Sequence, residues 1–445
     1  MENSKSASWK WQVCALLLLA TTINYMDRQT LALLAKEISK QFDLSKEQYG
    51  NVEMAFGLAF ALGGLFAGVA ADRFSVRWLF PLVLIGWSLA GIATAYVEPI
   101  GRTVLEFARD WFGSDLNWLG GGKSVEPGYL GLIICRTALG FFESGQWPCA
   151  LVVSQRILSR GERTLGNSLL QSGAAMGAII TPFVVKALVT FDGGGSWRWP
   201  FLIIGLVGML WIVPWWSLIG PRDLDLRQSA ESDDLRSGPE AAATSTSWVV
   251  NLRRMLVLAV LVVSINITWH FFRAWMPLFL GDFHRYGDST VLYFTPVYFA
   301  VADVGCLSIG YIVHRLIAGG MRIHTARVLM FWICAGLTAL STIVANLPSG
   351  PLLLVLLLVI GFGSLGLFPM YYAFTQEISA RHQGKISGIL GATTWTVTAL
   401  MQKFVGRSID ETHSYATGLF LVGLAPLVGA ICLTLFWGKT AETAE

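Results

Sequence analysis

The sequence has few charged residues. Only 14% of its 445 residues are Asp, Glu, Lys or Arg, whereas a soluble domain has about 25%. Hydrophobic residues make up 54%, and the mean hydropathy is +0.57. The net charge of +3 is small, and the basic residues stand in short segments between apolar stretches, so we expect no nucleic-acid partner. This composition predicts a polytopic membrane protein with the lipid bilayer as its surroundings.

The sequence also lacks the motifs of common enzymes. All six cysteines fall inside apolar stretches, so we expect neither a disulfide framework nor a metal site. No phosphate-cradling glycine-rich loop, nucleophile elbow or metal-ligand cluster is present. We therefore expect that the protein is not an enzyme and needs no cofactor. The first apolar stretch has no A-x-A-like cleavage site after it, so we interpret it as a membrane span.

Long apolar stretches are abundant instead. A membrane helix needs ~20 mostly apolar residues, and twelve stretches meet this requirement. Lys and Arg are more frequent in the segments that face the cytoplasm when both termini are inside. This predicts an all-α protein of the cytoplasmic (inner) membrane with cytoplasmic N- and C-termini. The predicted spans lie near residues 11–34, 50–71, 79–98, 128–155, 164–190, 198–219, 254–280, 290–316, 326–346, 351–378, 386–406 and 415–438.

Two polar stretches separate groups of spans. Residues 220–250 are rich in Ser, Ala and Asp and lack periodicity, which predicts a flexible cytoplasmic linker. This linker divides the chain into two six-helix bundles, residues 1–219 and 251–445. The other stretch, 99–127, has a helical apolar pattern as far as Phe112, as expected of an amphipathic helix on the membrane interface.

A repeated motif relates the two halves. Span four contains "GFFESGQWP" at 140–148, and span ten contains "GFGSLGLFP" at 361–369. Two homologous halves are typical of a transporter whose site lies between them at the membrane midplane. Glu143 aligns with Ser364, so the acidic residue belongs to the first half, and we expect the coupling chemistry there.

Charged residues inside the spans are the strongest functional signal. A charge at the centre of a span costs at least ~2.5–3.5 kcal/mol unless it is paired, hydrated or used. Asp27 and Arg28 lie in span one and point about 100° apart on a helix, so each needs its own partner. Arg136 and Glu143 lie two turns apart on one face of span four. We expect crossed ion pairs between these spans, which either brace the helices or couple proton uptake to anion binding by releasing an arginine.

The second half supplies further polar and aromatic candidates. Span seven contains "INITWHFFRAWMP" at 265–277. Arg273 could contact the substrate or reach the outer surface. Trp269 could stack on a sugar ring, and His270 is either a hydrogen-bonded packing residue or a proton relay.

Three other spans add candidate substrate contacts. Asp303 in span eight could pair with Arg273 or bind a sugar hydroxyl. Gln171 in span five could bind a hydroxyl beside closely packed glycines. Span eleven offers Trp395 and Gln402.

Three motifs give the sequence a family resemblance. "NYMDR" (24–28), "GVAADRFSVR" (68–77) and "RTALGFFESGQWP" (136–148) resemble the major facilitator superfamily. They are most similar to its anion:cation symporter branch, which includes hexuronate, galactonate and glucarate permeases. The resemblance covers the chain except 99–127 and 220–250.

The resemblance implies roles for the residues that match these motifs. Tyr25 and Arg28 would bind the substrate carboxylate. Asp27 and Glu143 would be the protonation sites. Arg136 would be the partner that holds an acid ionised.

The resemblance also implies a gate, and the chain departs from the family pattern at one position. Many members have a tyrosine where this chain has Phe60, whose ring can stack but cannot donate a hydrogen bond. The loop after span two resembles the conserved gate of the superfamily, and its Asp72 could sit at a helix N-terminus or meet an arginine of the other half. The alternative for its basic residues is membrane topology alone. The implied gating residues are Gly68, Asp72, Arg73 and Arg77.

These observations predict a secondary active transporter with the proton as its coupling ion. We expect symport of an organic anion, a hexuronate or related sugar acid, by alternating access in a monomer. One rival is an organophosphate:phosphate antiporter that would use Arg28 and Arg273. Another is a sensor on the same fold that binds its ligand without transport.

Overall fold

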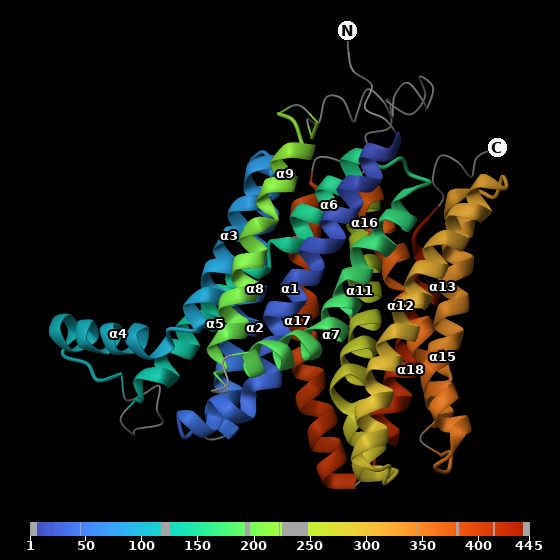
Figure 1. The fold of residues 1–445 in the computed structure, drawn as a ribbon. Helices are drawn as coiled ribbons and strands as arrows, with labels where there is room; N and C mark the ends of the chain where they lie inside the picture. The colour runs from blue at the N-terminus through green and yellow to red at the C-terminus, as the bar shows by residue number, and fades with distance from the viewer. Residues whose placement is uncertain are drawn as a thin grey trace.

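The computed structural model describes residues 7–44, 46–116, 125–191, 196–221, 223–224, 248–344, 346–379, 382–412 and 414–438. Within these ranges the chain is almost entirely helical and contains no strand (Figure 1). The predicted linker 220–250 lies mostly outside the described residues, so its boundaries stay a prediction.

The described helices form twelve spanning segments, as expected. Both termini lie at one end of the bundle, which we call the terminal face, and the opposite end is the far face (Figure 1). The segments of the first half are α1 (Ala7–Gln41), α2 (Lys46–Arg73), α3 (Val76–Thr94), α5 with α6 (Pro127–Glu143, Gln146–Ile157), α7 (Arg163–Phe191) and α8 with α9 (Arg198–Leu210, Ile212–Leu218).

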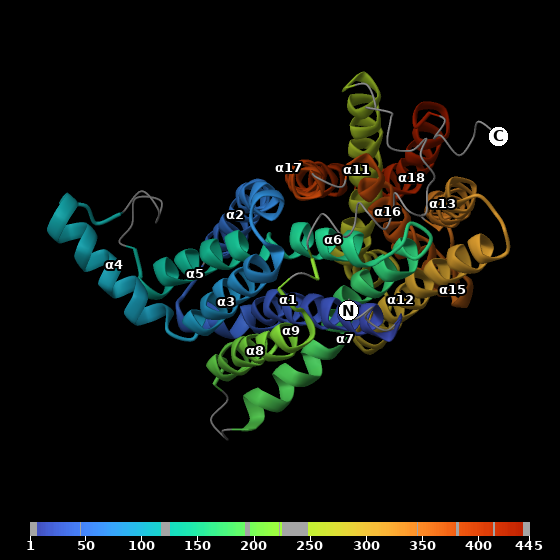
Figure 2. The same ribbon diagram turned by 90° about the horizontal axis from the view of Figure 1, so that it is seen from above.

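The second half lies beside the first when the bundle is seen along its axis (Figure 2). Its helices are α11 (Trp248–Leu278), followed by a π-helix (Phe279–Phe283), α12 (Asp288–Ala318), α13 with α14 (Ile323–Ala339, Ser341–Val344), α15 with α16 (Pro351–Gly366, Phe368–Ile378), α17 (Gln383–Thr412) and α18 (Ala416–Phe436). In the described residues, nine segments are long and apolar enough to cross a membrane by composition alone. The other three are α1, α5 with α6, and α17, and the first two of these contain Asp27, Arg28, Arg136 and Glu143.

Each copy of the repeated motif interrupts a helix. Within 140–148, α5 gives way to α6 between Glu143 and Gln146. Within 361–369, α15 gives way to α16 at Leu367. A proline stands in the first turn of both α6 and α16, where its missing N–H group has no partner to lose. The same break at the same place supports the internal repeat.

Glycines allow the two halves to pack closely between α2 and α17. A Cβ atom on Gly384 would lie 2.4 Å from the Gly68 carbonyl oxygen, and one on Gly388 would lie 2.4 Å from the Gly64 carbonyl oxygen. No larger side chain fits between backbones at this distance. The helices meet near the end of α2 and the start of α17, which is the terminal-face side of the bundle.

A further helix, α4 (Val97–Phe112), projects sideways from the bundle and lies across its axis (Figure 1). Its buried residues pack against α5, where a Cβ atom on Gly101 would lie 1.8 Å from the Pro127 carbonyl oxygen. Its other face is exposed. The sequence predicted the amphipathic helix, and its place at the membrane interface stays a prediction.

Candidate functional site

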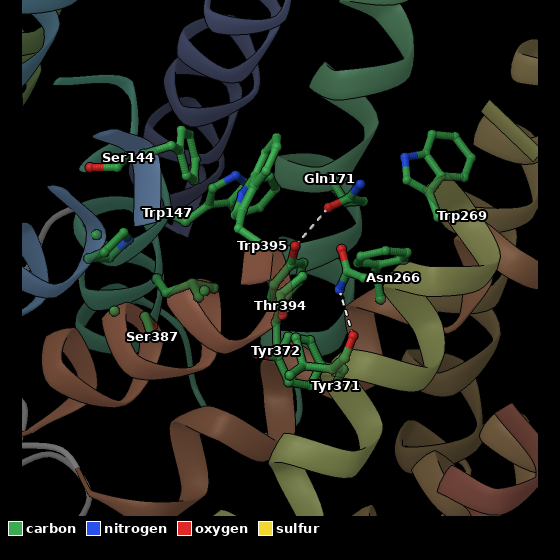
Figure 3. Close-up of a pocket in the computed structure, with 18 of the residues that line it drawn as sticks. Ser144, Trp147, Gln171, Asn266, Trp269, Tyr371, Tyr372, Ser387, Thr394 and Trp395 are labelled. Atoms are coloured by element: carbon green, nitrogen blue, oxygen red, sulfur yellow. Dashed lines mark hydrogen bonds between the residues drawn. The ribbon is translucent and has the colours of Figure 1, made fainter. Parts of the chain in front are cut away.

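A cavity lies between the two halves and is lined by helices of both (Figure 3). The first half contributes α1, α2, α6 and α7, and the second half contributes α11, α16 and α17. Most of the substrate-binding residues that the sequence predicted meet here. Those that line the cavity are Tyr25, Arg28, Phe60, Gln171, Trp269, His270 and Trp395.

Arg28 lies in a box of aromatic rings. Its guanidinium carbon is 5.0 Å from the ring centre of Tyr25 and 5.2 Å from that of Phe56. It is 5.1 Å from the ring centre of Phe60 and 5.5 Å from that of Trp395, which belongs to the second half. A desolvated contact between a cation and a ring face contributes about 2 kcal/mol. Aromatic rings from both halves therefore hold the same guanidinium.

Arg28 also forms the expected ion pair between spans one and four. Its Nη2 and Nε atoms donate to Oε2 of Glu143 at 2.8 and 3.2 Å. The Arg28 side chain is 9% exposed and the Glu143 side chain is fully buried. Oε1 of Glu143 has no hydrogen-bond partner among the described residues. One carboxylate oxygen thus holds the cation that faces the cavity.

The second crossed pair, between Asp27 and Arg136, is absent from the described part of the structure. Arg136 donates instead to Oε1 of Glu53 on α2 at 3.2 Å, and its guanidinium lies 4.6 Å from the ring centre of Phe56. The reason is packing, because α5 lies directly against α2. Glu53 was not predicted as a site residue, although it is an acidic residue inside the predicted span 50–71.

Asp27 points away from the cavity, toward α3. Both of its carboxylate oxygens are buried without a hydrogen-bond partner among the described residues. A Cβ atom on Gly91 of α3 would lie 3.1 Å from Oδ1 of Asp27. Asn24 on α1 and Trp87 and Ser88 on α3 also have buried polar atoms without a partner among the described residues. Helices α1 and α3 thus contain several polar groups whose hydrogen bonds are not made by described protein atoms.

The contacts of Asp303 also differ from the expected ion pair with Arg273. Its Oδ2 accepts a hydrogen bond from the hydroxyl of Ser172 at 2.8 Å, across the boundary between the halves. It neither lines the cavity nor pairs with Arg273. Asp303 lies two turns from Gly310 on one face of α12, and that face packs against α7, where a Cβ atom on Gly310 would lie 2.3 Å from the Ser168 hydroxyl. The close packing of α12 on α7 turns the acid toward α7.

The remaining candidates of span seven lie together on α11. Trp269 and His270 line the cavity, whereas Arg273 lies one turn further along the helix and is half-buried. The Nε atom of Arg273 is buried without a partner among the described residues. The side chain of Gln402 lies outside the described part of the structure.

Several polar contacts in the cavity were not predicted. The hydroxyl of Tyr372 donates to Oε1 of Gln171 at 3.0 Å (Figure 3). The ring of Tyr372 stacks on Trp147 with 5.1 Å between ring centres. Asn266 lines the cavity one turn before His270. It could have been predicted, because it lies in the same 265–277 stretch as the predicted residues of span seven.

Two of the predicted gating residues contact the other half, and the other two do not. Gly68 contacts the backbone of Gly384 in the other half, and Asp72 accepts hydrogen bonds from two N–H groups in the first turn of α17, at 2.7 and 3.0 Å. Asp72 therefore sits at a helix N-terminus, the first of its two expected arrangements. Arg77 donates to a backbone carbonyl of its own half, and Arg73 is exposed.

Buried polar side chains join the halves on the same side. Asn167 donates to Oε1 of Gln376 at 3.0 Å, and Nε2 of Gln376 donates to the hydroxyl of Ser154 at 2.6 Å. Arg327 donates to the hydroxyl of Thr164 at 3.0 Å. Together with the α2–α17 contact, these bonds close the cavity toward the terminal face.

Two similar six-helix halves around a central cavity with buried charges define the class of secondary membrane transporters. The chain belongs to the Major Facilitator Superfamily, because residues 17–402 match the model of that family. It is therefore an integral membrane transporter and not an enzyme, and the predicted fold is confirmed.

Curated relatives match over nearly their full length. The chain is 23% identical to the hexuronate transporter of Escherichia coli (strain K12), over 98% of this chain and 96% of the relative. It is 24% identical to the probable galactarate/D-glucarate transporter of the same strain, over 97% and 95%. It is 22% identical to the hexuronate transporter of Bacillus subtilis (strain 168), over 98% and 97%.

Solved structures share the fold. A proton:xylose symporter superimposes with a TM-score of 0.73 at 14% identity, over 98% of this chain and 97% of the other. A transporter of the same superfamily in the outward conformation, FucP, gives 0.67 at 12% identity, over 97% and 100%. At these identities the likeness establishes the fold alone.

Proposed function

We propose that this transporter is a proton-coupled symporter of an organic anion, a hexuronate or related sugar acid, that works by alternating access. The observation that carries the proposal is the position of Arg28. Its guanidinium lines the central cavity and is held by one oxygen of a buried carboxylate, Glu143. The full-length similarity to sugar-acid transporters supports the choice of substrate.

The cavity offers complementary groups for each part of a sugar acid. A guanidinium binds a carboxylate through two parallel hydrogen bonds, and Tyr25 lies beside Arg28. The ring of Trp395 offers an apolar face to the sugar ring. The side-chain amides of Gln171 and Asn266 can exchange their present bonds for bonds to hydroxyl groups.

Proton coupling follows from competition for Arg28. A proton on Glu143 removes the charge that holds Arg28 and frees the guanidinium for the substrate carboxylate. Asp27 is the second proton site in this scheme, because its carboxylate has no partner among the described residues and can load a proton without breaking a bond. Arg136 stabilises negative charge in this region while it is paired with Glu53.

Alternating access requires that the contacts on the terminal-face side break. The N–H groups at the start of α17 must release Asp72, and the backbones of Gly68 and Gly384 must separate. The distribution of basic residues supports a cytoplasmic terminal face, and the inner membrane is part of the proposal. One chain supplies both halves of the cavity, which supports function as a monomer.

Proton-driven uptake into proteoliposomes tests the proposal. We expect the purified protein to accumulate labelled D-glucuronate when an inward proton gradient is imposed. Replacement of both acids, Asp27→Asn with Glu143→Gln, should reduce accumulation to the level of empty liposomes. Glu98→Gln removes an acid that pairs with Arg198 away from the cavity and should leave uptake intact.

Three results would contradict the proposal. Unchanged proton-driven accumulation in the double variant would remove both acids from the coupling scheme. Exchange of phosphate for a sugar phosphate without any need for a proton gradient would favour the organophosphate antiporter, and binding without flux would favour a sensor.

A further inference from the structure

Glu53 lies on the face of α2 that lines the cavity. Phe60 and Gly64 of this helix line the cavity, and Glu53 precedes them by two and three turns along the same face. Its side chain is 41% exposed. The exposed apolar residues Leu58 and Leu62 lie on the opposite side of the helix. Because α2 runs from the far face to the terminal face, this carboxylate lies on the far-face side of the cavity.

The space beside this face of α2 widens toward the far face. A Cβ atom on Gly68 would lie 2.5 Å from a backbone oxygen of α17, and one on Gly64 would lie 3.8 Å from another. A Cβ atom on Gly57, one turn from Glu53, would meet no described atom within 4 Å. The two halves therefore separate along α2 from the terminal face toward Glu53, which leaves its carboxylate on the side that water can reach from the far face.

Arg136 connects this exposed carboxylate to the buried part of the site. Its Nη2 atom donates to Oε1 of Glu53 at 3.2 Å, and its own side chain is 1% exposed. The ring of Phe56 contacts two guanidiniums, with its centre 4.6 Å from that of Arg136 and 5.2 Å from that of Arg28. The Arg136–Glu53 pair and the buried pair of Arg28 thus share one aromatic ring.

Arg136 also has donors that are not in use. Its Nε and Nη1 atoms are buried and have no hydrogen-bond partner among the described residues. Both carboxylate oxygens of Asp27 and Oε1 of Glu143 likewise lack a described partner. Arg136 acts on both of these acids electrostatically. If Glu53 loses its charge, Arg136 can turn to an acid that is already near, which avoids an unpaired buried cation.

Other charged groups also act on Glu53. Arg28 on α1, Glu143 on α5 and Arg273 on α11 interact with it electrostatically. The described charged side chains of α3 and α6 lie at the terminal-face ends of these helices. Helix α17 also packs against α2, and of its charged side chains the structure describes two, which stand at opposite ends of the helix, Lys385 and Glu411. A change in the charge of Glu53 is therefore felt by the arginines of the central site.

We infer that Glu53 is the entry site for the coupling proton from the far face, and that it passes this proton to Glu143. The proton leaves water on the far-face side and binds a carboxylate oxygen of Glu53, which releases Arg136. Transfer of the proton to Oε1 of Glu143 restores the charge of Glu53, and Glu53 binds Arg136 again. One proton thus moves from water to Glu143, and no electrons are transferred. The inference rests on the proposed function, because it gives the route of the same coupling proton.

Two transport assays separate proton entry from substrate movement. In proteoliposomes with the intact protein, accumulation of labelled D-glucuronate under an inward proton gradient requires a proton to bind and leave in each cycle. Exchange of labelled for unlabelled D-glucuronate at equal pH on both sides does not, because the loaded carrier can return with its proton bound. We expect Glu53→Gln to lower the initial rate of accumulation at least about 10-fold, and to change the exchange rate less than about 3-fold, as loss of a proton-transfer group implies.

Two further variants show whether the acid itself is needed. Glu53→Asp keeps a carboxyl group that can take up a proton, so it should retain more of the accumulation rate than Glu53→Gln. Glu106→Gln removes an exposed acid of α4 and should leave both rates unchanged. Thermal unfolding of each purified variant shows whether the fold is intact.

The outcomes distinguish this inference from the proposed function. Undiminished accumulation in Glu53→Gln overturns Glu53 as the entry site and leaves coupling through Glu143 in place. A loss of exchange as large as the loss of accumulation also overturns it, because a purely structural role would give that result. If the unmodified protein exchanges D-glucuronate but does not accumulate it under the proton gradient, proton coupling itself is overturned, and this inference with it.

Discussion

At the scale of single residues, Arg28 combines two kinds of contact that depend on each other. Four ring faces surround its guanidinium, and one oxygen of Glu143 balances its charge. The rings exclude water, which strengthens the ion pair in this low-dielectric environment. The same exclusion makes an unpaired Arg28 expensive, so a loss of the Glu143 charge must be met by another anion.

Replacement of Arg28 by lysine tests whether the shape of the guanidinium matters beyond its charge. A lysine ammonium is a point charge that cannot form two parallel bonds to one carboxylate. We expect Arg28→Lys to raise the substrate concentration that gives half-maximal sugar-acid uptake by about 10- to 100-fold. The effect on the thermal unfolding temperature should be smaller. Arg102→Lys on the exposed face of α4 is the control. Its half-maximal substrate concentration should equal that of the unmodified protein. Equal uptake by Arg28→Lys would mean that the site needs only a positive charge.

The site residues show how far sequence reasoning reaches at this scale. The cost of a charge in a span identifies Arg28 and Glu143 as functional candidates, and their pairing follows from having opposite charges on neighbouring spans. The partners of Arg136 and Asp303 could not be predicted in this way. Each depends on which neighbouring helix packs against that face, and this is decided by contacts such as that of Gly310 with α7.

At the scale of helices, the sequence predicted the twelve spans but not their breaks. Apolar length and polar gaps suffice to locate each span. The breaks after Glu143 and at Leu367 leave the spans apolar, so hydropathy gives no signal for them. The repeated glycines and prolines could have predicted these breaks, because both residues weaken a helix interior.

Helix α4 is the element whose environment is easiest to test. Its distal end exposes Trp111 and Phe112, at 75% and 74%, and both rings contact Phe107. Interfacial helices carry such aromatic residues on the face that meets the lipid. Because α4 lies across the axis of the spans (Figure 1), this end should lie in the plane of the membrane surface.

Spin labels on opposite faces of α4 measure this directly. Cys432 is the one cysteine that is not buried, so it is first replaced by serine. In that protein a label at Trp111→Cys should be relaxed more by oxygen, which concentrates in lipid, than by a water-soluble nickel complex. A label at Arg102→Cys should show the opposite order. Water-like exposure at both positions would place α4 away from the bilayer.

At the scale of the whole molecule, the contacts between the halves gather toward the terminal face. The crossing of α2 and α17 brings backbones together through glycine, and Asp72 binds the first turn of α17. Gln376 connects α16 to α6 and α7 through buried hydrogen bonds. The central cavity lies next to these contacts. In the proposed alternating-access mechanism, a change of a few kcal/mol there would shift the balance between closed and open forms.

A single methyl group at Gly68 should shift that balance. A Cβ atom there would lie 2.5 Å from the Gly384 carbonyl oxygen, and overpacking of this kind costs about 1–3 kcal/mol. With spin labels at Arg160→Cys and Arg315→Cys, which are exposed on opposite halves, Gly68→Ala should transfer population from short to long distances. Gly57→Ala on the same helix, where no atom lies within 4 Å, should keep the original distances. If both variants keep the short distances, the glycine contact does not hold the terminal face closed, and the hydrogen bonds of Asp72 and Gln376 must do so.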